Sequence, residues 1–346
     1  ARSRTSWGAF HPEAEEEVRS TLCQKQFIAA AGGLDAAMMV APCTAYGSRK
    51  HPTLAETIEN YDLKLEGLRA TVEKLIEAHG IHVIAFQEVK SEEVVRHALG
   101  KFSGHFEVCV APHSTFQTVA FAWDKSVLAS EYTCIPHRDL AIAEHVGEKH
   151  RRVRPGLALE LIVNGLPVTF LNIHLKSGCA NLHGSRRWPS RLLTDPEAAC
   201  TVLNRQVPIL EDWIEQVASR SPRFILLGDF NRRIDQEARA RIARTEVRAD
   251  GSDPAEANIK DEAGGVKSDY LWQEIADGSP PMYQVYLKSL EPGCKGLAGL
   301  DHIVVSGPIK RAQRERLYSS KIAPVKRSRQ PIPTSDHCPT ITTVEL

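Results

Sequence analysis

Residues 224–231 read FILLGDFN, an apolar run of strand length that ends in a glycine, an acid and an amide. The apolar run predicts a strand buried on both faces, and Gly228 lets the backbone turn tightly where that strand stops. Side chains two residues apart point the same way along a strand, so Asp229 and Asn231 should face one site. A carboxylate beside an amide suits a metal or a phosphate, and a helix N-cap or a turn is the alternative explanation.

Polar side chains end or interrupt further strand-like runs in the same manner. In chain order, these runs are 83–88, 168–176, 300–305 and 335–339. Alternation along the second run places Asn172, His174 and Lys176 on one face, beyond two apolar residues. Three converging polar groups favour phosphate binding, and a satisfied core histidine is the alternative for His174. Glu88, at the end of the first run, suits a hard divalent cation, with a buried structural glutamate as its alternative.

These segments, in this order, resemble the endonuclease/exonuclease/phosphatase superfamily of deoxyribonuclease-like proteins. The resemblance extends from about Met38 to the C-terminus. It implies a four-layer α/β/β/α sandwich, in which two packed mixed β-sheets are covered by helices on both outer faces. Pattern and composition alone reach only an α/β or α+β protein. An amphipathic stripe over 62–79 precedes the strand expected at 83–86, and a second stripe follows from Glu197.

The same resemblance implies a metal site. Glu88 and Asp336 would hold the ion, with Mg²⁺ or Mn²⁺ expected and Ca²⁺ as a third candidate. The family's first strand ends in an aromatic residue and a metal-binding asparagine, whereas Pro42, Cys43 and Thr44 occupy the corresponding positions here. This is the main departure from the family pattern, and Thr44 would offer a hydroxyl in place of the amide. Zinc is not expected, because the histidines and cysteines lack zinc-finger and metalloprotease spacing.

On the resemblance, the remaining polar residues divide the catalytic work. Asp229 would orient or activate the attacking water, and Asn231 would contact the phosphate beside it. Asp301 would pair with His337, fixing the tautomer of the imidazole and raising its basicity. His174 would contact the phosphate or protonate the leaving oxygen. The division of acid and base roles among Asp229, His174 and His337 stays open at this point.

A cluster of guanidinium groups precedes another strand-like run. Three arginines within 151–154 suit phosphate oxygens, because arginine presents paired donors in a fixed fork. A solvated loop explains two of them equally well, and Arg154 is preferred because the family often has an arginine and a proline here. The substrate phosphate would then contact Arg154, Asn172 and Lys176. His302 is expected to point away from the neighbouring aspartate and is left outside the site.

Charge and hydropathy limit the classes of partner. Lysine plus arginine balance aspartate plus glutamate at 43 each in 346 residues, so no net field favours polyanions. Attraction to nucleic acid or anionic lipid must therefore be local. A basic segment over 307–330 offers such a patch, with a solvated surface as the alternative. No stretch is long and apolar enough to span a bilayer.

The chain reads as one catalytic domain with an extension. We expect an N-terminal extension over 1–36 and a catalytic domain over 37–346, with insertions near 178–200 and 235–278. Eight cysteines without a Cys-x-x-Cys pair favour disulfides in a secreted or periplasmic protein, and eight free thiols in a cytoplasmic protein is the alternative. A bond between the cysteines that bracket the first insertion would order that polar loop.

The expected function is a divalent-metal-dependent phosphoester hydrolase. Nucleic acid, DNA or RNA, is the first substrate expected, because extracellular family members are commonly nucleases. A phosphatase or phosphodiesterase for a lipid or inositol headgroup, or another small phosphoester, is the nearest alternative. Members acting on phosphoinositides typically carry a Trp-Cys-Asp-Arg run where this chain has GLDH at 299–302, which counts against that branch. A non-catalytic binding module is supported only by the absent first-strand asparagine.

Overall fold

The computed structural model describes most of the chain from Leu54 onward. The described residues are 54–113, 115, 117–126, 131–145, 152–180, 191–239, 270–276, 278–290, 299–309, 314–316, 334, 335 and 337–346. Several expectations lie outside them: the N-terminal extension, the first strand with Thr44, the metal ligand Asp336, most of the basic segment 307–330 and most of the insertion 235–278.

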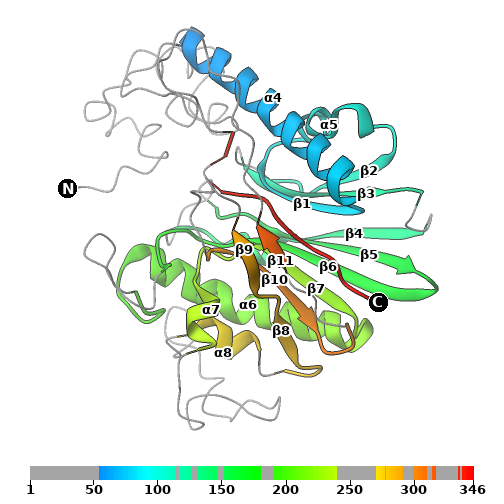
Figure 1. Ribbon diagram of the computed structural model, residues 1–346. Coiled ribbons are helices and arrows are strands. Elements are labelled where there is room, and N and C mark those ends of the chain that lie inside the picture. Colours follow the sequence, from blue (N-terminus) through cyan, green and yellow to red (C-terminus); the bar gives the residue numbers. More distant parts are fainter. Residues whose placement is uncertain are drawn as a thin grey trace.

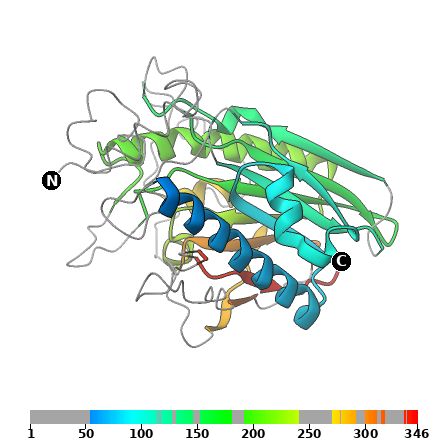
Figure 2. The same ribbon diagram turned by 90° about the horizontal axis from the view of Figure 1, so that it is seen from above.

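Helices and strands stack into four layers (Figure 1). The first layer contains α4 (Leu54–His79) and α5 (Glu92–Leu99), which is followed by the 3₁₀ turn η3 (Gly100–Phe102). The second layer is an antiparallel sheet of β1 (Val83–Val89), β3 (Thr118–Asp124) and β2 (Phe106–Val110), in that spatial order. Seen from above, α4 and α5 lie across the outer face of this sheet (Figure 2).

A six-stranded mixed sheet forms the third layer. Its spatial order is β4 (Tyr132–His137), β5 (Gly156–Val163), β6 (Leu166–His174), β7 (Phe224–Asp229), β10 (Asp301–Ser306) and β8 (Met282–Gln284). The neighbours β6 and β7 run parallel, and the other neighbours are antiparallel. A small third sheet, which the sequence did not predict, contains β12 (Thr340–Thr342), β11 (Arg314–Arg316) and β9 (Leu287–Leu290).

The fourth layer covers the outer face of the six-stranded sheet with α6 (Ala198–Arg220), α7 (Ile234–Glu237) and α8 (Leu271–Ile275). Because β6 and β7 are parallel neighbours, they need a long crossover, and α6 supplies it. Both predicted helices are confirmed, the first beginning at Leu54 rather than 62 and the second continuing through Pro208. None of the helices in the described ranges has the length and apolarity that a membrane span requires.

Three apolar clusters fill the spaces between the four layers. Phe121, Leu159 and Ile225 belong to the cluster between the two large sheets. Strand β6 serves two clusters by alternation, because Phe170 faces the opposite sheet whereas Leu171 faces the helices of the fourth layer. The third cluster lies beneath α4 and α5. The α/β/β/α sandwich expected from the family resemblance is therefore confirmed.

Disulfides fasten these layers together. Cys109 of β2 is bonded to Cys134 of β4, so an edge strand of the β1–β3–β2 sheet is covalently linked to an edge strand of the six-stranded sheet. Cys179, which follows β6, is bonded to Cys200 near the start of α6, as the sequence predicted. Cys338 is disulfide-bonded as well, and within the described residues no cysteine is free.

Candidate active site

Three adjacent strands of the six-stranded sheet present polar residues at the same edge. His174 of β6 lies opposite Asp229 of the parallel strand β7, and Asp301 begins the antiparallel strand β10 opposite the same Asp229. Strand pairing therefore sets three side chains side by side that are far apart in the sequence. His174 and Asp229 are buried, and their Nε2 and Oδ2 atoms are 3.5 Å apart. This edge is the candidate active site.

The turn after β7 explains why the strand ends in glycine, acid and amide. Gly228 has a φ of +133°, and a Cβ there would collide with the backbone carbonyl oxygen of Ile173. Only glycine fits at this close approach. Asn231 also has a positive φ, +51°, and its backbone and side-chain N–H groups donate to the two oxygens of Asp229, at 2.7 and 2.9 Å. The two side chains do meet, but through a turn and not through a continued strand.

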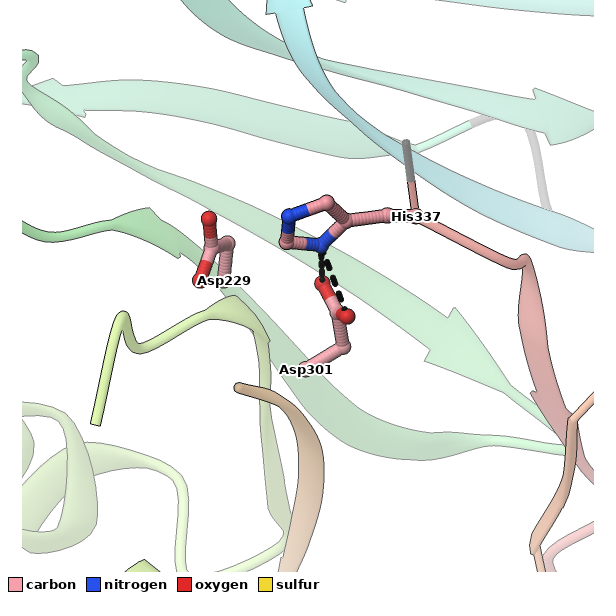
Figure 3. A group of neighbouring side chains, drawn as sticks. All are labelled: Asp229, Asp301 and His337. Carbon is pink, nitrogen blue, oxygen red and sulfur yellow. Dashed lines mark hydrogen bonds and ion pairs between the residues drawn. The ribbon is translucent and has the colours of Figure 1, made fainter. Parts of the chain in front are cut away.

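The second half of the site is an aspartate–histidine pair (Figure 3). His337 lies shortly before β12, and its Nδ1 is 2.8 and 3.0 Å from the two oxygens of Asp301. Because a carboxylate only accepts hydrogen bonds, Nδ1 is the donor, and the neutral ring then has Nε2 as its basic nitrogen. One potential metal-ligand atom from each of Asp229, Asp301 and His337 lies within 4.8 Å of the others. The pairing expected for Asp301 and His337 is present, directly beside Asp229.

Burial and neighbouring charges shift two pKa values in the site. The pKa of Asp229 rises from 3.8 to about 7, first because burial disfavours the charged form and second because Asp301 lies opposite. The pKa of His174 falls well below its ordinary value, because the ring is buried and because Arg154 and His337 are close. At neutral pH, His174 is therefore uncharged, whereas Asp229 exchanges a proton readily.

Glu88 reaches the same edge from the opposite sheet. The pairing of β1 with β3 is irregular between Gln87 and Val89, and Glu88, at this bulge, has a φ of +60°. Residues other than glycine rarely adopt this conformation, and a bulge redirects the side chain it carries. The Glu88 side chain is 56% exposed, and its Oε1 lies 3.9 Å from Nε2 of His174. The bulge thus aims an accessible carboxylate at the candidate site.

Two expected phosphate ligands lie beside the turn. Arg154 Nη2 donates to the Leu175 carbonyl at 2.7 Å, and the same carbonyl accepts from Asn231 Nδ2 at 3.0 Å. Arg154 Nε is buried and has no hydrogen-bond partner among the described residues. Lys176 is held by Glu144, with Nζ and Oε2 3.2 Å apart. Sequence patterns did not identify Glu144, because this acid comes from a loop distant in the chain.

The third expected phosphate ligand, Asn172, does not reach the site. It is fully buried: Nδ2 donates to the carbonyls of Phe86 and Ala120, at 3.1 and 2.9 Å, and Oδ1 accepts from Gln87 Nε2 at 2.8 Å. These bonds join the six-stranded sheet to the sheet of β1, β3 and β2. The prediction that Asn172 contacts substrate is therefore wrong. Alternation predicted the correct face of β6, but that face points between the sheets and only its end reaches the site.

Two further residues near the turn are buried. His302 lies outside the site, as expected, with Nε2 3.0 Å from the Arg232 carbonyl and its ring edge-on to Phe230. Arg232 was missed, because beside Arg233 it resembles charged surface, whereas its side chain is fully buried. No local signal in the sequence marks Arg232 as buried, because the carbonyl groups that its Nη1 contacts come from Cys179 and Arg191, far away in the chain.

The donor set suits a hard divalent cation. Glu88, Asp229 and Asp301 supply carboxylate oxygens at one edge, and such oxygens are the ligands that Mg²⁺ and Ca²⁺ prefer. Burial, and after it the neighbouring Asp301, raises the pKa of Asp229, and a cation close to both carboxylates would favour the ionised form. The residues present therefore fit the metal that the family resemblance implies.

Comparison with known proteins complements this geometry. The sequence model of the Endonuclease/Exonuclease/phosphatase family matches residues 59–337. No curated protein sequence gives a significant match. A solved mannosyl-6-phosphatase of Bacteroides thetaiotaomicron is 11% identical, with 82% of this chain and 92% of that chain covered and a TM-score of 0.47. D. rerio TDP2 complexed with a single-strand DNA product is 12% identical, with 82% and 93% covered and a TM-score of 0.43. A functionally unknown conserved protein from Enterococcus faecalis is 17% identical, with 81% and 90% covered and a TM-score of 0.44.

Proposed function

The chain belongs to the endonuclease/exonuclease/phosphatase family of metal-dependent phosphoester hydrolases, and from this premise we propose that it is a nuclease that cleaves phosphodiester bonds of DNA or RNA. The observation that carries the proposal is the Asp301–His337 pair beside a buried Asp229 whose pKa is about 7. Groups that transfer protons work best when their pKa lies near the working pH. The site thus combines a proton acceptor and a proton donor within reach of one another.

Asp229 is the base that activates the attacking water. Both of its oxygens accept hydrogen bonds from Asn231, so the carboxylate keeps one orientation. With a pKa of about 7 it is ionised in a large share of molecules at neutral pH and can accept the proton of the water. Asn231 Nδ2 already donates to Asp229 and to the Leu175 carbonyl. We therefore assign Asn231 to orienting Asp229 and not to binding the phosphate.

His174 and Arg154 bind the non-bridging oxygens of the scissile phosphate. His174 is uncharged at neutral pH, so it acts as a hydrogen-bond donor and not as an acid. Arg154 brings a permanent charge next to the turn, where its contact with the Leu175 carbonyl fixes the guanidinium. Lys176 adds positive charge at the same edge, partly balanced by Glu144.

His337 protonates the leaving oxygen. Its Nδ1 donates to Asp301, so a proton on Nε2 creates an imidazolium that the Asp301 carboxylate stabilises. That proton passes to the departing oxygen as the phosphorus–oxygen bond breaks, and His337 returns to its neutral form. Asp229 as base and His337 as acid is the division of roles that the geometry favours.

A divalent cation, Mg²⁺ or Mn²⁺, completes the proposed site. Glu88 and Asp336 are its proposed ligands, because Glu88 aims an exposed carboxylate at the edge and Asp336 precedes His337 directly in the chain. The bound ion supplies Lewis-acid stabilisation of the charge that builds on the phosphate oxygens. An alternative ligand set is Asp229, Asp301 and His337, and the engagement of Asp301 with His337 Nδ1 weighs against it.

Substrate class and location are proposed on two further observations. Cys109–Cys134 and Cys179–Cys200 are bonded, which favours a secreted or periplasmic protein, because disulfides persist in oxidising compartments. The segment GLDH at 299–302 departs from the run that phosphoinositide-directed members carry. The first observation favours nucleic acid because extracellular family members are commonly nucleases, and the second counts against a phosphoinositide headgroup.

A substrate panel tests the proposal. Wild-type protein is incubated with supercoiled plasmid, single-stranded RNA, bis(p-nitrophenyl) phosphate, p-nitrophenyl phosphate and an inositol phosphate, each with Mg²⁺, Mn²⁺ or EDTA. We expect plasmid or RNA to be cleaved with metal and to stay intact in EDTA. Hydrolysis of only the phosphomonoesters would contradict the nuclease assignment in favour of a phosphatase. No hydrolysis of any substrate would favour the non-catalytic module.

A further inference from the structure

Arg232 directly follows the turn that carries Asp229 and Asn231, and it is charged although its side chain is fully buried. Its Nε donates to Oε1 of Glu237 at 2.6 Å, and the Glu237 side chain is only 1% exposed. Its Nη1 donates to the carbonyl oxygens of Cys179 and Arg191, at 2.8 and 2.7 Å. Burial of a charge is costly unless it is paired and hydrogen-bonded, and these contacts meet that requirement.

The partners of Arg232 come from separate parts of the chain. On one side, Nη1 also lies 3.4 Å from Sγ of Cys179, whose disulfide to Cys200 ties the loop after β6 to α6. On the other side, Glu237 belongs to α7, and its second carboxylate oxygen accepts from the backbone N–H of Trp272 in α8 at 2.8 Å. The guanidinium is therefore fixed between a disulfide-bonded loop and two short helices.

The backbone next to Arg232 turns through a left-handed residue that belongs to the site. Asn231 adopts a φ of +51°, a conformation that asparagine tolerates better than most residues with a side chain. This conformation lets the Asn231 backbone and side chain hold both oxygens of Asp229. The backbone N–H of Arg233 donates to the Ala180 carbonyl at 3.0 Å, so the loop beside Cys179 contacts the turn a second time.

We propose that Arg232 is a positioning residue for phosphoester hydrolysis: held by Glu237 and by the loop that the Cys179–Cys200 disulfide closes, it keeps Asn231, and through it Asp229, in the reactive arrangement. The inference rests on the proposed role of Asp229 as base. Arg232 does not contact substrate, because its side chain is fully buried. Loss of the disulfide frees the segment that carries the Cys179 carbonyl, and the turn then leaves its left-handed conformation.

The two disulfides provide a matched comparison. The test variant is Cys179→Ser/Cys200→Ser, and the control is Cys109→Ser/Cys134→Ser. The bonded cysteines are 21 and 25 residues apart, so the two changes release nearly the same chain constraint. The control bond joins β2 to β4 and takes part in none of the hydrogen bonds of Arg232.

Two readouts separate positioning from stability. Hydrogen–deuterium exchange follows the turn 229–233, where the amide of Asn231 is bonded to Asp229; we expect about tenfold faster exchange in the test variant. With bis(p-nitrophenyl) phosphate, we expect kcat to fall about tenfold to a hundredfold while KM stays within about twofold. The control should match wild type in both. Equal changes in the two variants, or unchanged exchange in the test variant, would overturn the proposal. Exchange needs no turnover, so it decides the inference even if wild type hydrolyses nothing and the proposed function alone fails.

A second set of variants tests Arg232 itself. Removing Arg232 alone would leave Glu237 buried without its partner, so both charges are removed together in Arg232→Met/Glu237→Gln, which leaves no uncompensated buried charge and keeps an oxygen that can accept from the Trp272 N–H. We expect this variant to unfold near the wild-type temperature but to show the faster exchange and lower kcat of the disulfide variant. Arg232→Lys keeps one charged donor beside Glu237, so its exchange rate and its kcat should lie between those of the double variant and those of wild type. Wild-type kcat and exchange in the double variant would refute the positioning role.

Discussion

The carboxylate of Asp229 lies buried among a histidine, an asparagine and a second aspartate, and its pKa there is about 7. An aspartate in the unfolded chain titrates near about 3.9. The folded protein therefore binds this proton more tightly than the unfolded chain does. The stability that the group contributes is complete below about pH 4 and is lost as the pH rises through about 7.

This sign can be measured with Asp229→Asn in EDTA. Between about pH 4 and pH 8, we expect the free energy of unfolding of wild type to fall relative to the variant by up to about 4 kcal/mol, because only wild type must ionise a buried carboxyl. Urea unfolding at several pH values gives the difference. Saturating Mg²⁺ should recover part of it by favouring the ionised form. If the free energies of unfolding of the two proteins depend on pH in the same way, the pKa of Asp229 is not raised.

The positive φ of Glu88 destabilises the backbone but directs the Glu88 carboxylate toward the candidate site. Its φ of +60° costs a residue with a side chain about 1–2 kcal/mol, whereas glycine adopts it freely. We expect Glu88→Gly to raise the free energy of unfolding by about 1 kcal/mol while abolishing metal-dependent hydrolysis. Glu88→Gln is the control, because it keeps the backbone cost and removes the charge. Calorimetry of Mg²⁺ binding and thermal unfolding report the two effects, and full Mg²⁺ affinity in both variants would exclude Glu88 as a ligand.

At the scale of elements, packing restricts the sequence of β7 near its end. Its Gly228 lies against the backbone of β6, so Gly228→Ala should push the two strands apart and displace Asp229. Gly165, in the turn between β5 and β6, has a φ of +77° and no atom near its missing Cβ, so Gly165→Ala is the control. We expect the free energy of unfolding to fall by about 1–2 kcal/mol in the control. In Gly228→Ala it should fall clearly further, and activity should be lost. Urea unfolding measures both, and equal costs would show that the close approach is unimportant.

Element positions followed from local pattern, whereas their irregularities did not. The apolar run ending at Phe86 and the alternation before His174 are properties of neighbouring residues, so those strands were predictable. The bulge at Glu88 depends on how β1 meets β3, which no local window contains. The small sheet of β9, β11 and β12 likewise pairs segments that are far apart in the sequence. These features come from tertiary contacts and were therefore missed.

At the level of the whole molecule, Asn172 joins the two large sheets through three hydrogen bonds. We expect Asn172→Ala to destabilise the protein by about 1–3 kcal/mol, because buried partners lose their bonds, and to leave kcat and KM within about twofold. Arg154→Lys is the contrasting variant. It loses the donor fork next to the turn, so kcat should fall by about a hundredfold with little change in unfolding. If Asn172→Ala instead raised KM and left the free energy of unfolding unchanged, Asn172 would contact the substrate after all.

The four-layer fold was predictable through the family resemblance, which also named Asp229, Asp301 and His337, the residues that the structure brings together in the candidate site. What could not be predicted is how buried each residue would be. Asn172 and Arg232 both carry groups that bind phosphate in other settings, yet each is enclosed by segments distant in the sequence. Strand alternation and charge patterns describe faces and surfaces, and burial depends on which other elements cover them.

Turnover of bis(p-nitrophenyl) phosphate with Mg²⁺, compared between wild type and Asp301→Asn, is the most direct measurement of the central claim. The claim is that Asp301 orients His337 as the acid beside Asp229. We predict that kcat falls by about 10²–10⁴ in the variant, because an amide neither fixes the tautomer nor stabilises the imidazolium. The unfolding temperature should change by only a few degrees. Undiminished turnover in Asp301→Asn, or equal wild-type turnover in EDTA, would contradict the account.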